Sequence, residues 1–175
     1  AIAAALGDAD VVHTHTWYAN FAGHLAKLIH GVPHVMTSHS LEPLRPWKVE
    51  QLGRSYHLST WVEKLALENA DRVVAVSQQA RADILAHFAV APEKVRVIHN
   101  GIDLDIYRKS HATATREAFE LEGDYVLFVG RTSRQKGMEH LIDAAARLAP
   151  GVRVVCCTSA PDTQEIEREI ESRVA

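Results

Sequence analysis

Short apolar runs alternate along most of the chain with stretches in which apolar residues recur every three or four positions. The short runs have the length and composition of buried strands, and the periodic stretches are typical of amphipathic helices. Strands are predicted at residues 10–13, 34–39, 71–76 and 95–98, and again at 125–129 and 152–157. Because a regular alternation of strand and helix builds parallel sheets, the sequence predicts an α/β fold of doubly wound, Rossmann-like sheets.

Capping residues predict where several helices begin and end. Asn20 stands before an apolar stripe and is expected to cap the helix that carries it. Gly31 is expected to end that helix, and Pro33 prevents its continuation. Ser77 is expected to cap a later helix, whose buried face would be formed by Ile84, Leu85 and Phe88.

A polar segment interrupts the alternation and predicts the domain organisation. We expect residues 1–103 to form the second half of an N-terminal Rossmann-like domain. Residues 104–122 are expected to be a hinge or linker with a short helix near 116–121, and residues 123–175 the beginning of a second domain. The last block is too short for an independent domain, so we expect a truncated chain or a partner that completes the second sheet.

Composition excludes some partners and suggests a compartment. The net charge of −3 does not favour a nucleic-acid or anionic-membrane partner, and no apolar run is long enough to predict a membrane span. The adjacent Cys156 and Cys157 would point to opposite faces of a strand, so we expect buried free thiols and a cytoplasmic location. The chain begins at Ala1 without a methionine, which adds to the expectation of a fragment. Its oligomeric state stays open, with a homo-oligomer possible.

A basic loop between a strand and a helix is the strongest chemical signal. The run 125–129 has no polar position, as in a strand covered on both faces, and Gly130 ends it. Arg131 and Lys136 follow, and Gly137 opens an amphipathic helix. A helix N-terminus attracts anions, Arg131 has two donors for a phosphate, and Lys136 adds a compact charge. We therefore predict that this loop holds a diphosphate.

Other polar positions also follow predicted strands. Ligands of open α/β sheets bind beyond the carboxyl ends of the strands. The polar strand ends are His13–Thr16, Thr37–Ser40, Ser77, Asn100–Asp103 and Gly130–Lys136. Several such ends at one rim predict a ligand site.

Read together, these residues resemble the retaining GT-B glycosyltransferases, most closely the bacterial glycogen synthase branch of the actinobacterial type. The resemblance covers nearly the whole chain and rests on an ordered set of motifs. In chain order these are Val-Val-His-Thr-His-Thr-Trp at 11–17, Val-Met-Thr-Ser-His at 35–39, Ser-Leu-Glu-Pro-Leu-Arg-Pro-Trp-Lys at 40–48, Ala-Asp-Arg-Val-Val-Ala-Val-Ser at 70–77, Asn-Gly-Ile-Asp at 100–103, and Phe-Val-Gly-Arg followed by Gln-Lys-Gly at 128–137.

The resemblance implies an enzyme with two Rossmann-like domains and a cleft between them. It implies that Arg131, Lys136 and His39 are catalytic, the two cations on the diphosphate of a nucleotide sugar and His39 against the donor sugar. Asn100 and Gly130 would complete the binding residues. In close relatives the donor is ADP-glucose, and glucose passes with retention to an α-1,4-glucan end or to glucose 1-phosphate, giving maltose 1-phosphate. No metal or other cofactor is implied, because the two cations take the place that magnesium fills elsewhere.

The chain also departs from the family pattern. The N-terminal glycine-rich loop and the Glu-x7-Glu region of the second domain are absent. Glu42 and Glu50 have the latter spacing, but Pro43 and Pro46 lie between them. The chain alone is therefore expected to be inactive, and neither the donor base nor the acceptor is fixed by the sequence.

Several alternatives remain open from the residues themselves. His13 and His15 share a strand face and are compatible with structure, ligand contact or a metal site. Asn100-Gly101 has the composition of a turn with positive φ. Arg45 and Lys48 are either ordinary surface charges or contacts to an anionic acceptor, and Arg134 reads as a solvated charge. At the level of function, the alternatives are a nucleotide-sugar epimerase of the same fold and a non-catalytic nucleotide-sugar-binding fragment.

Overall fold

The computed structural model describes residues 6, 8–109 and 113–174. The chain divides into two compact units, residues 1–107 and 108–175, and each is described by itself. The predicted hinge, residues 104–122, spans this division, and its residues 110–112 lie outside the described part. The predicted domain boundaries stay predictions.

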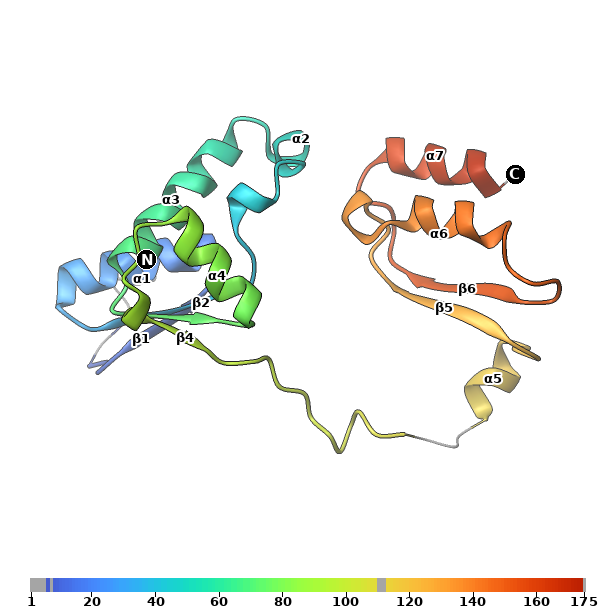
Figure 1. Ribbon diagram of the computed structural model, residues 1–175, viewed down its shortest axis with the longest axis horizontal. Helices are drawn as coiled ribbons and strands as arrows, with labels where there is room; N and C mark the ends of the chain where they lie inside the picture. Colours follow the sequence, from blue (N-terminus) through green and yellow to red (C-terminus); the bar gives the residue numbers. More distant parts are fainter. Residues whose placement is uncertain (1–5, 7, 110–112, 175) are drawn as a thin grey trace. The chain divides into compact units, whose positions relative to one another are not determined.

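The first unit is a four-stranded parallel sheet with helical crossovers (Figure 1). The strands run in the order β1 (Val12–His15), β2 (His34–Ser38), β3 (Arg72–Ala75) and β4 (Val95–Val97). The helices are α1 (Trp17–His30), α2 (Lys48–Leu52), α3 (Ser55–Asn69) and α4 (Gln78–His87), and the short 3-10 turns are η2 (Glu42–Leu44) and η3 (Pro92–Lys94). The predicted parallel α/β architecture is confirmed.

One face of this sheet carries the core. Alternate strand residues are buried, as Val12 and Thr14 are in β1, whereas His13 and His15 between them are exposed. The core cluster on the buried side contains Met36, Leu41, Ala66, Leu67, Ala70, Val73, Ala75, Ile84, Phe88, Val90 and Val95. Since successive strand residues point to opposite faces, His13 and His15 lie on the face away from this core.

Gly23 lets helix α1 approach the sheet closely. A methyl group at this position would lie 2.4 Å from Nε2 of His34 and 2.7 Å from Cγ2 of Thr14. The His34 side chain is fully buried and has no room to move aside. Glycine is therefore required at this contact between α1 and strands β1 and β2.

We predict that Gly23→Ala destabilises the protein by about 2 kcal/mol, because an extra methyl group overpacks this contact. The same change in a helix interior without such a neighbour would stabilise by about 1 kcal/mol, so the sign of the effect is diagnostic. Urea unfolding of the intact protein measures it. Gly101→Ala is the control, since a methyl group there has nothing within 4 Å. A Gly23→Ala variant as stable as the parent would contradict the close approach.

The helix ends confirm some predictions and correct others. Gly31 ends α1 in the left-handed conformation at φ 71°, and the Ser77 hydroxyl accepts the Ala80 N–H at 3.0 Å to cap α4, both as predicted. Asn20 does not cap α1, because the helix begins three residues earlier at Trp17 and Asn20 is buried inside it. Strand β1 likewise runs to His15, so the histidines predicted as a tip lie within the strand.

The second unit is a parallel pair of strands with two helices (Figure 1). Strands β5 (Tyr125–Gly130) and β6 (Arg153–Thr158) pair in parallel, with Gly130 opposite Thr158. The helical segments are α5 (Ala114–Ala118), η4 (Arg134–Lys136), α6 (Met138–Ala145) and α7 (Gln164–Val174). The short helix predicted near 116–121 is therefore present but starts earlier.

Two predictions about burial in this unit are wrong within the described chain. Leu127 is 53% and Val129 is 72% exposed, although the apolar run predicted a strand covered on both faces. Figure 1 shows α6 and α7 on the same side of the strand pair, and within the described part of this unit neither of them covers the other side. Cys156 and Cys157 are free as predicted, but both are exposed rather than buried. Cys157 is opposite Val129 in the strand pair and shares its open face, whereas Cys156 lies on the other face, where its Sγ is 4.0 Å from Sδ of Met138. None of the described helices has the length and apolar character needed to cross a membrane.

Candidate functional site

The carboxyl ends of β1 and β2 form the rim of a pocket of about 140 Å³ in the first unit. Residues of the two strand ends, the start of α1 and the loop after β2 line it. They are Thr16, Trp17, Tyr18, Asn20, Met36, Thr37, Ser38, His39, Ser40, Glu42, Arg45, Lys48 and Glu63. The polar strand ends predicted for residues 13–16 and 37–40 are thus brought together where ligands of α/β sheets bind.

Three histidines stack across β1 and the end of β2, and His39 among them also lines the pocket. The ring centroids of His13 and His15 are 4.7 Å apart, and those of His15 and His39 are 5.2 Å apart. Nδ1 of His15 and Nε2 of His39 are 2.9 Å apart, and Nε2 of His13 lies 2.8 Å from the Thr37 hydroxyl. Because the bond between His15 and His39 needs one N–H and one lone pair, it excludes two imidazolium rings. Burial, with the neighbouring His15, lowers the pKa of His13.

A buried polar network lies beneath the rim. The Thr14 hydroxyl donates to Oδ1 of Asn20 at 2.7 Å and lies 2.7 Å from Nε2 of His34. Because the Thr14 hydroxyl donates its proton to Asn20, it acts as the acceptor toward His34, and the Nε2–H group of His34 is the donor. Burial lowers the pKa of His34 to about 4, so its ring is neutral near pH 7. The network fixes Asn20 against the pocket, a role that the prediction of a helix cap missed.

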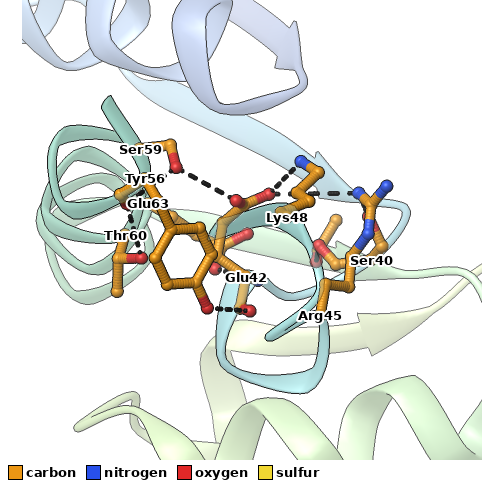
Figure 2. Close-up of polar contacts among 9 residues, drawn as sticks. Ser40, Glu42, Arg45, Lys48, Tyr56, Ser59, Thr60 and Glu63 are labelled. Atoms are coloured by element: carbon orange, nitrogen blue, oxygen red, sulfur yellow. Dashed lines mark hydrogen bonds and ion pairs between the residues drawn. The ribbon is translucent and has the colours of Figure 1, made fainter. Parts of the chain in front are cut away.

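Two buried glutamates from distant parts of the chain meet at the floor of the pocket (Figure 2). Oε2 of Glu63 accepts the backbone N–H of Glu42 at 2.7 Å. Glu42 is 2% and Glu63 is 5% exposed. Burial is the main cause that raises the pKa of Glu63 to about 7, and the nearby Glu42 carboxylate adds to it. Glu63 is therefore largely protonated below neutral pH.

Two cations, one from the loop after β2 and one from the start of α2, approach the Glu42 carboxylate. Nζ of Lys48 lies 2.5 Å from Oε1 of Glu42, and Nη1 of Arg45 lies 3.9 Å from the same atom. The Ser59 hydroxyl donates to the other carboxylate oxygen at 3.0 Å. Figure 2 shows the two cations on one side of the carboxylate and Ser59 on the other.

The loop after β4 differs from its prediction. Asn100 and Gly101 are exposed, and neither has positive φ, so the predicted turn is not at these residues. The turn follows instead at Asp103, whose carboxylate accepts the backbone N–H of Asp105 at 2.9 Å. Asn100 stands on the solvent side of the loop, and its role toward a ligand stays a prediction.

The predicted diphosphate loop lies at the carboxyl end of β5 in the second unit. Gly130 ends the strand, and the Lys136 side chain packs over it, since Cδ of Lys136 would lie 3.8 Å from a methyl group at Gly130. The Arg131 side chain is 60% exposed, with Asp162 as its ion-pair partner at 3.5 Å. The Thr132 hydroxyl donates to the Ser159 carbonyl at 3.0 Å and fixes the loop against the strand that follows.

The Arg134 side chain forms ion pairs with helix α7. It pairs with Glu169 at 3.1 Å and Glu165 at 3.7 Å on α7. Gly137 adopts the left-handed conformation at φ 67° and begins α6, as the sequence predicted. The loop therefore presents Arg131 and Lys136 at a strand end that leads into a helix N-terminus, where an anion is favoured.

The glutamate pair is the part of the site that the sequence analysis missed. A signal was present, because Glu63 falls at helical spacing from the buried Ser59 and Ala66 on the inner face of α3. Glu42 meets Glu63; the spacing of Glu42 and Glu50 noted in the sequence stays untested, because the Glu50 side chain lies outside the described part. Within residues 6, 8–109 and 113–174, no cluster of three histidine, cysteine or acidic side chains is arranged to hold a metal ion.

Comparisons with known proteins identify relatives of the whole chain. A family model described as Glycosyltransferase Family 4 matches residues 1–106. The α-maltose-1-phosphate synthase of Mycolicibacterium smegmatis is 50% identical over 172 residues, which cover 95% of this chain and 44% of that protein. The enzyme of the same name from Mycobacterium tuberculosis is 46% identical over 180 residues, covering 99% of this chain and 46% of that one. The chain thus spans about half the length of these relatives.

A solved structure agrees with the fold. Anabaena HepE in complex with UDP-glucose superposes with a TM-score of 0.78 at 22% identity, over 99% of this chain and 46% of that one. At this level of identity the match supports the architecture.

Proposed function

Because the chain belongs to Glycosyltransferase Family 4, we propose that the intact protein transfers glucose, with retention, from a sugar nucleotide to an acceptor hydroxyl. The proposed donor is ADP-glucose, and the proposed acceptor is an α-1,4-glucan end or glucose 1-phosphate, in glycogen synthesis. The similarity to two α-maltose-1-phosphate synthases supports glucose 1-phosphate as the acceptor. The observation that carries the proposal is the cationic loop at the end of β5, with Arg131 and Lys136 in front of α6.

In this proposal the loop stabilises the departing nucleoside diphosphate. As the bond from the anomeric carbon to the β-phosphate oxygen breaks, its electron pair stays on that oxygen and negative charge grows there. Lys136 and Arg131 neutralise the charge, which is catalysis directed at the transition state. The acceptor oxygen bonds to the anomeric carbon, and its proton passes to the departing diphosphate oxygen. His39 is the proposed contact to the donor sugar, and Asn100 and Gly130 are proposed binding residues; no metal ion is invoked.

A donor and acceptor screen of the intact protein tests the proposal. We expect release of nucleoside diphosphate from ADP-glucose only when an acceptor is present, and an α-linked product. UDP-glucose in a parallel reaction identifies the preferred base. An epimerised sugar nucleotide formed without acceptor would contradict the proposal and favour an epimerase. Donor binding without any turnover would indicate a non-catalytic binding protein instead.

A further inference from the structure

A surplus of positive charge at the end of β2 is left unexplained by the roles proposed above. Arg45 and Lys48 both lie near one oxygen of Glu42, and both line the pocket beneath the histidine rim. Lys48 at 2.5 Å from that oxygen is a complete ion pair by itself. Arg45 at 3.9 Å is a second cation that the single carboxylate does not require.

The second glutamate does not balance this charge. Glu63 is buried beside Glu42, and it contacts the Glu42 backbone N–H rather than either cation. Two carboxylates held this close favour one proton between them. Below its pKa of about 7, Glu63 is mostly neutral and does not offset the charge of Arg45 and Lys48, whereas above that pH its carboxylate increasingly does.

Arg45 also has donors to spare. Its Nη1 donates to the Ser40 hydroxyl at 2.9 Å, but its Nε is buried and has no hydrogen-bond partner within the described residues. A buried donor without a partner is costly, so the present contacts of Arg45 leave part of its hydrogen-bonding capacity unused. Because Nε is closed to solvent, a ligand in the pocket would be met by the terminal Nη groups of Arg45.

The loop that carries the two cations is held rigidly. The Tyr56 hydroxyl donates to the Glu42 carbonyl at 2.7 Å, and the backbone N–H groups of Arg45 and Lys48 donate to the Glu42 and Arg45 carbonyls at 2.9 and 3.0 Å. The Arg45 and Lys48 side chains are only 21% and 13% exposed, so water screens them weakly. Preorganised, partly desolvated cations bind an anion more strongly than the same charges on a mobile surface loop.

We propose that Arg45 and Lys48 form a subsite for the phosphate group of a phosphorylated acceptor sugar. The inference rests on the proposed function, which assigns the donor diphosphate to Arg131 and Lys136 and leaves the acceptor open. A phosphate monoester suits this pair because the guanidinium offers a fork of donors and the ammonium a point charge. The Ser40 hydroxyl, held by Arg45, is a further polar group at the same wall. A neutral glucan end would leave the surplus charge without a partner.

Arg45→Gln in the intact protein is the decisive variant, because it leaves the pair of Lys48 and Glu42 in place. Transfer rates are measured with glucose 1-phosphate and with maltose as acceptors. We expect the ratio of kcat/KM for the phosphorylated over the unphosphorylated acceptor to fall at least tenfold. Lys64→Gln is the control, since Lys64 pairs with Glu68 on the outer side of α3 and should leave the ratio unchanged. An unchanged ratio in Arg45→Gln, or equal losses with both acceptors, would overturn the subsite.

A binding measurement separates the subsite from the proposed function. Inorganic phosphate is titrated into the intact parent, Arg45→Gln and Arg131→Ala proteins, and its binding is followed by calorimetry. We expect Arg45→Gln to weaken one class of phosphate site at least tenfold while Arg131→Ala retains it. If this holds but no acceptor is glycosylated, the subsite stands and the proposed function fails. If transfer proceeds and phosphate binding does not depend on Arg45, the subsite fails and the function stands.

Discussion

Replacing Lys136 with alanine is expected to lower the kcat of the intact protein by about a hundredfold or more. Removing one preorganised charge that acts on the transition state typically has an effect of this size. The Lys136 side chain is exposed, and its Cδ lies near Gly130 at the end of β5, so the residue starts from the strand end at which the diphosphate is proposed to bind. Steady-state rates of diphosphate release measure the effect, and donor KM should change much less than kcat.

Arg134→Ala is the matched control for this prediction. Arg134 lies two positions from Lys136 in the same loop, but its charge is paired with Glu165 and Glu169 on α7. Exposed ion pairs of this kind contribute about 1 kcal/mol or less to stability, and we expect kcat to stay within twofold. Equal losses in Lys136→Ala and Arg134→Ala would show a general effect of loop charge, and an unchanged Lys136→Ala rate would refute its assigned role.

The sequence predicted those parts of the fold that depend on local chemistry. The alternation of strands and helices, the left-handed Gly31 and the Ser77 cap are each determined by residues within a few positions of one another. Arg131 and Lys136 were predicted for the same reason, because strand, loop and helix start follow directly in the chain. Their placement at the end of β5 agrees with that prediction, while their function still awaits a test.

The errors arose where a residue's neighbours come from elsewhere in the chain. Asn20 is a residue type that often caps helices, but its side chain accepts a hydrogen bond from Thr14 on β1 and is buried. Leu127 and Val129 were predicted to be buried because apolar runs usually have two covering layers, and within the described part of the second unit α6 and α7 supply only one. The exposed faces of β5 therefore reflect what packs on the strand rather than the strand's own sequence.

The glutamate pair shows the same limit at the site. Glu42 follows a predicted strand and Glu63 lies in a predicted helix, 21 positions apart. Glu42 alone reads as an ordinary surface charge, and the helical spacing that places Glu63 on the inner face of α3 does not identify its partner. Their contact depends on how η2 packs against α3, and no local sequence pattern specifies that packing. The raised pKa of Glu63 and the unbalanced charge of Arg45 depend on the same packing.

The parent protein is expected to become less stable as pH rises, and Glu63→Gln is expected to abolish this decrease. The pKa of Glu63 is about 7 in the folded protein, against 4.5 for an unperturbed glutamate. Between these values the unfolded chain has released the proton while the folded protein still holds it, so rising pH favours unfolding. The difference amounts to about 3 kcal/mol and is complete above pH 7. Glutamine keeps an acceptor for the Glu42 N–H and cannot ionise, so the free energy of unfolding of the variant should not fall with pH in this way.

Urea unfolding of the parent and the variant at pH 4.5 and pH 8 tests this prediction. The quantity compared is the change in the free energy of unfolding between the two pH values, in the parent and in the variant. Glu68→Gln is the control on the same helix, with the opposite sign. Hydrogen bonds from Lys64 and from the Ala89 N–H lower the pKa of Glu68, so its contribution is lost as pH falls rather than as it rises. Parallel pH profiles for the parent and Glu63→Gln would mean that Glu63 is ionised throughout this range. In that case the two carboxylates would balance Arg45 and Lys48, and the positive charge proposed to attract a phosphate would not exist.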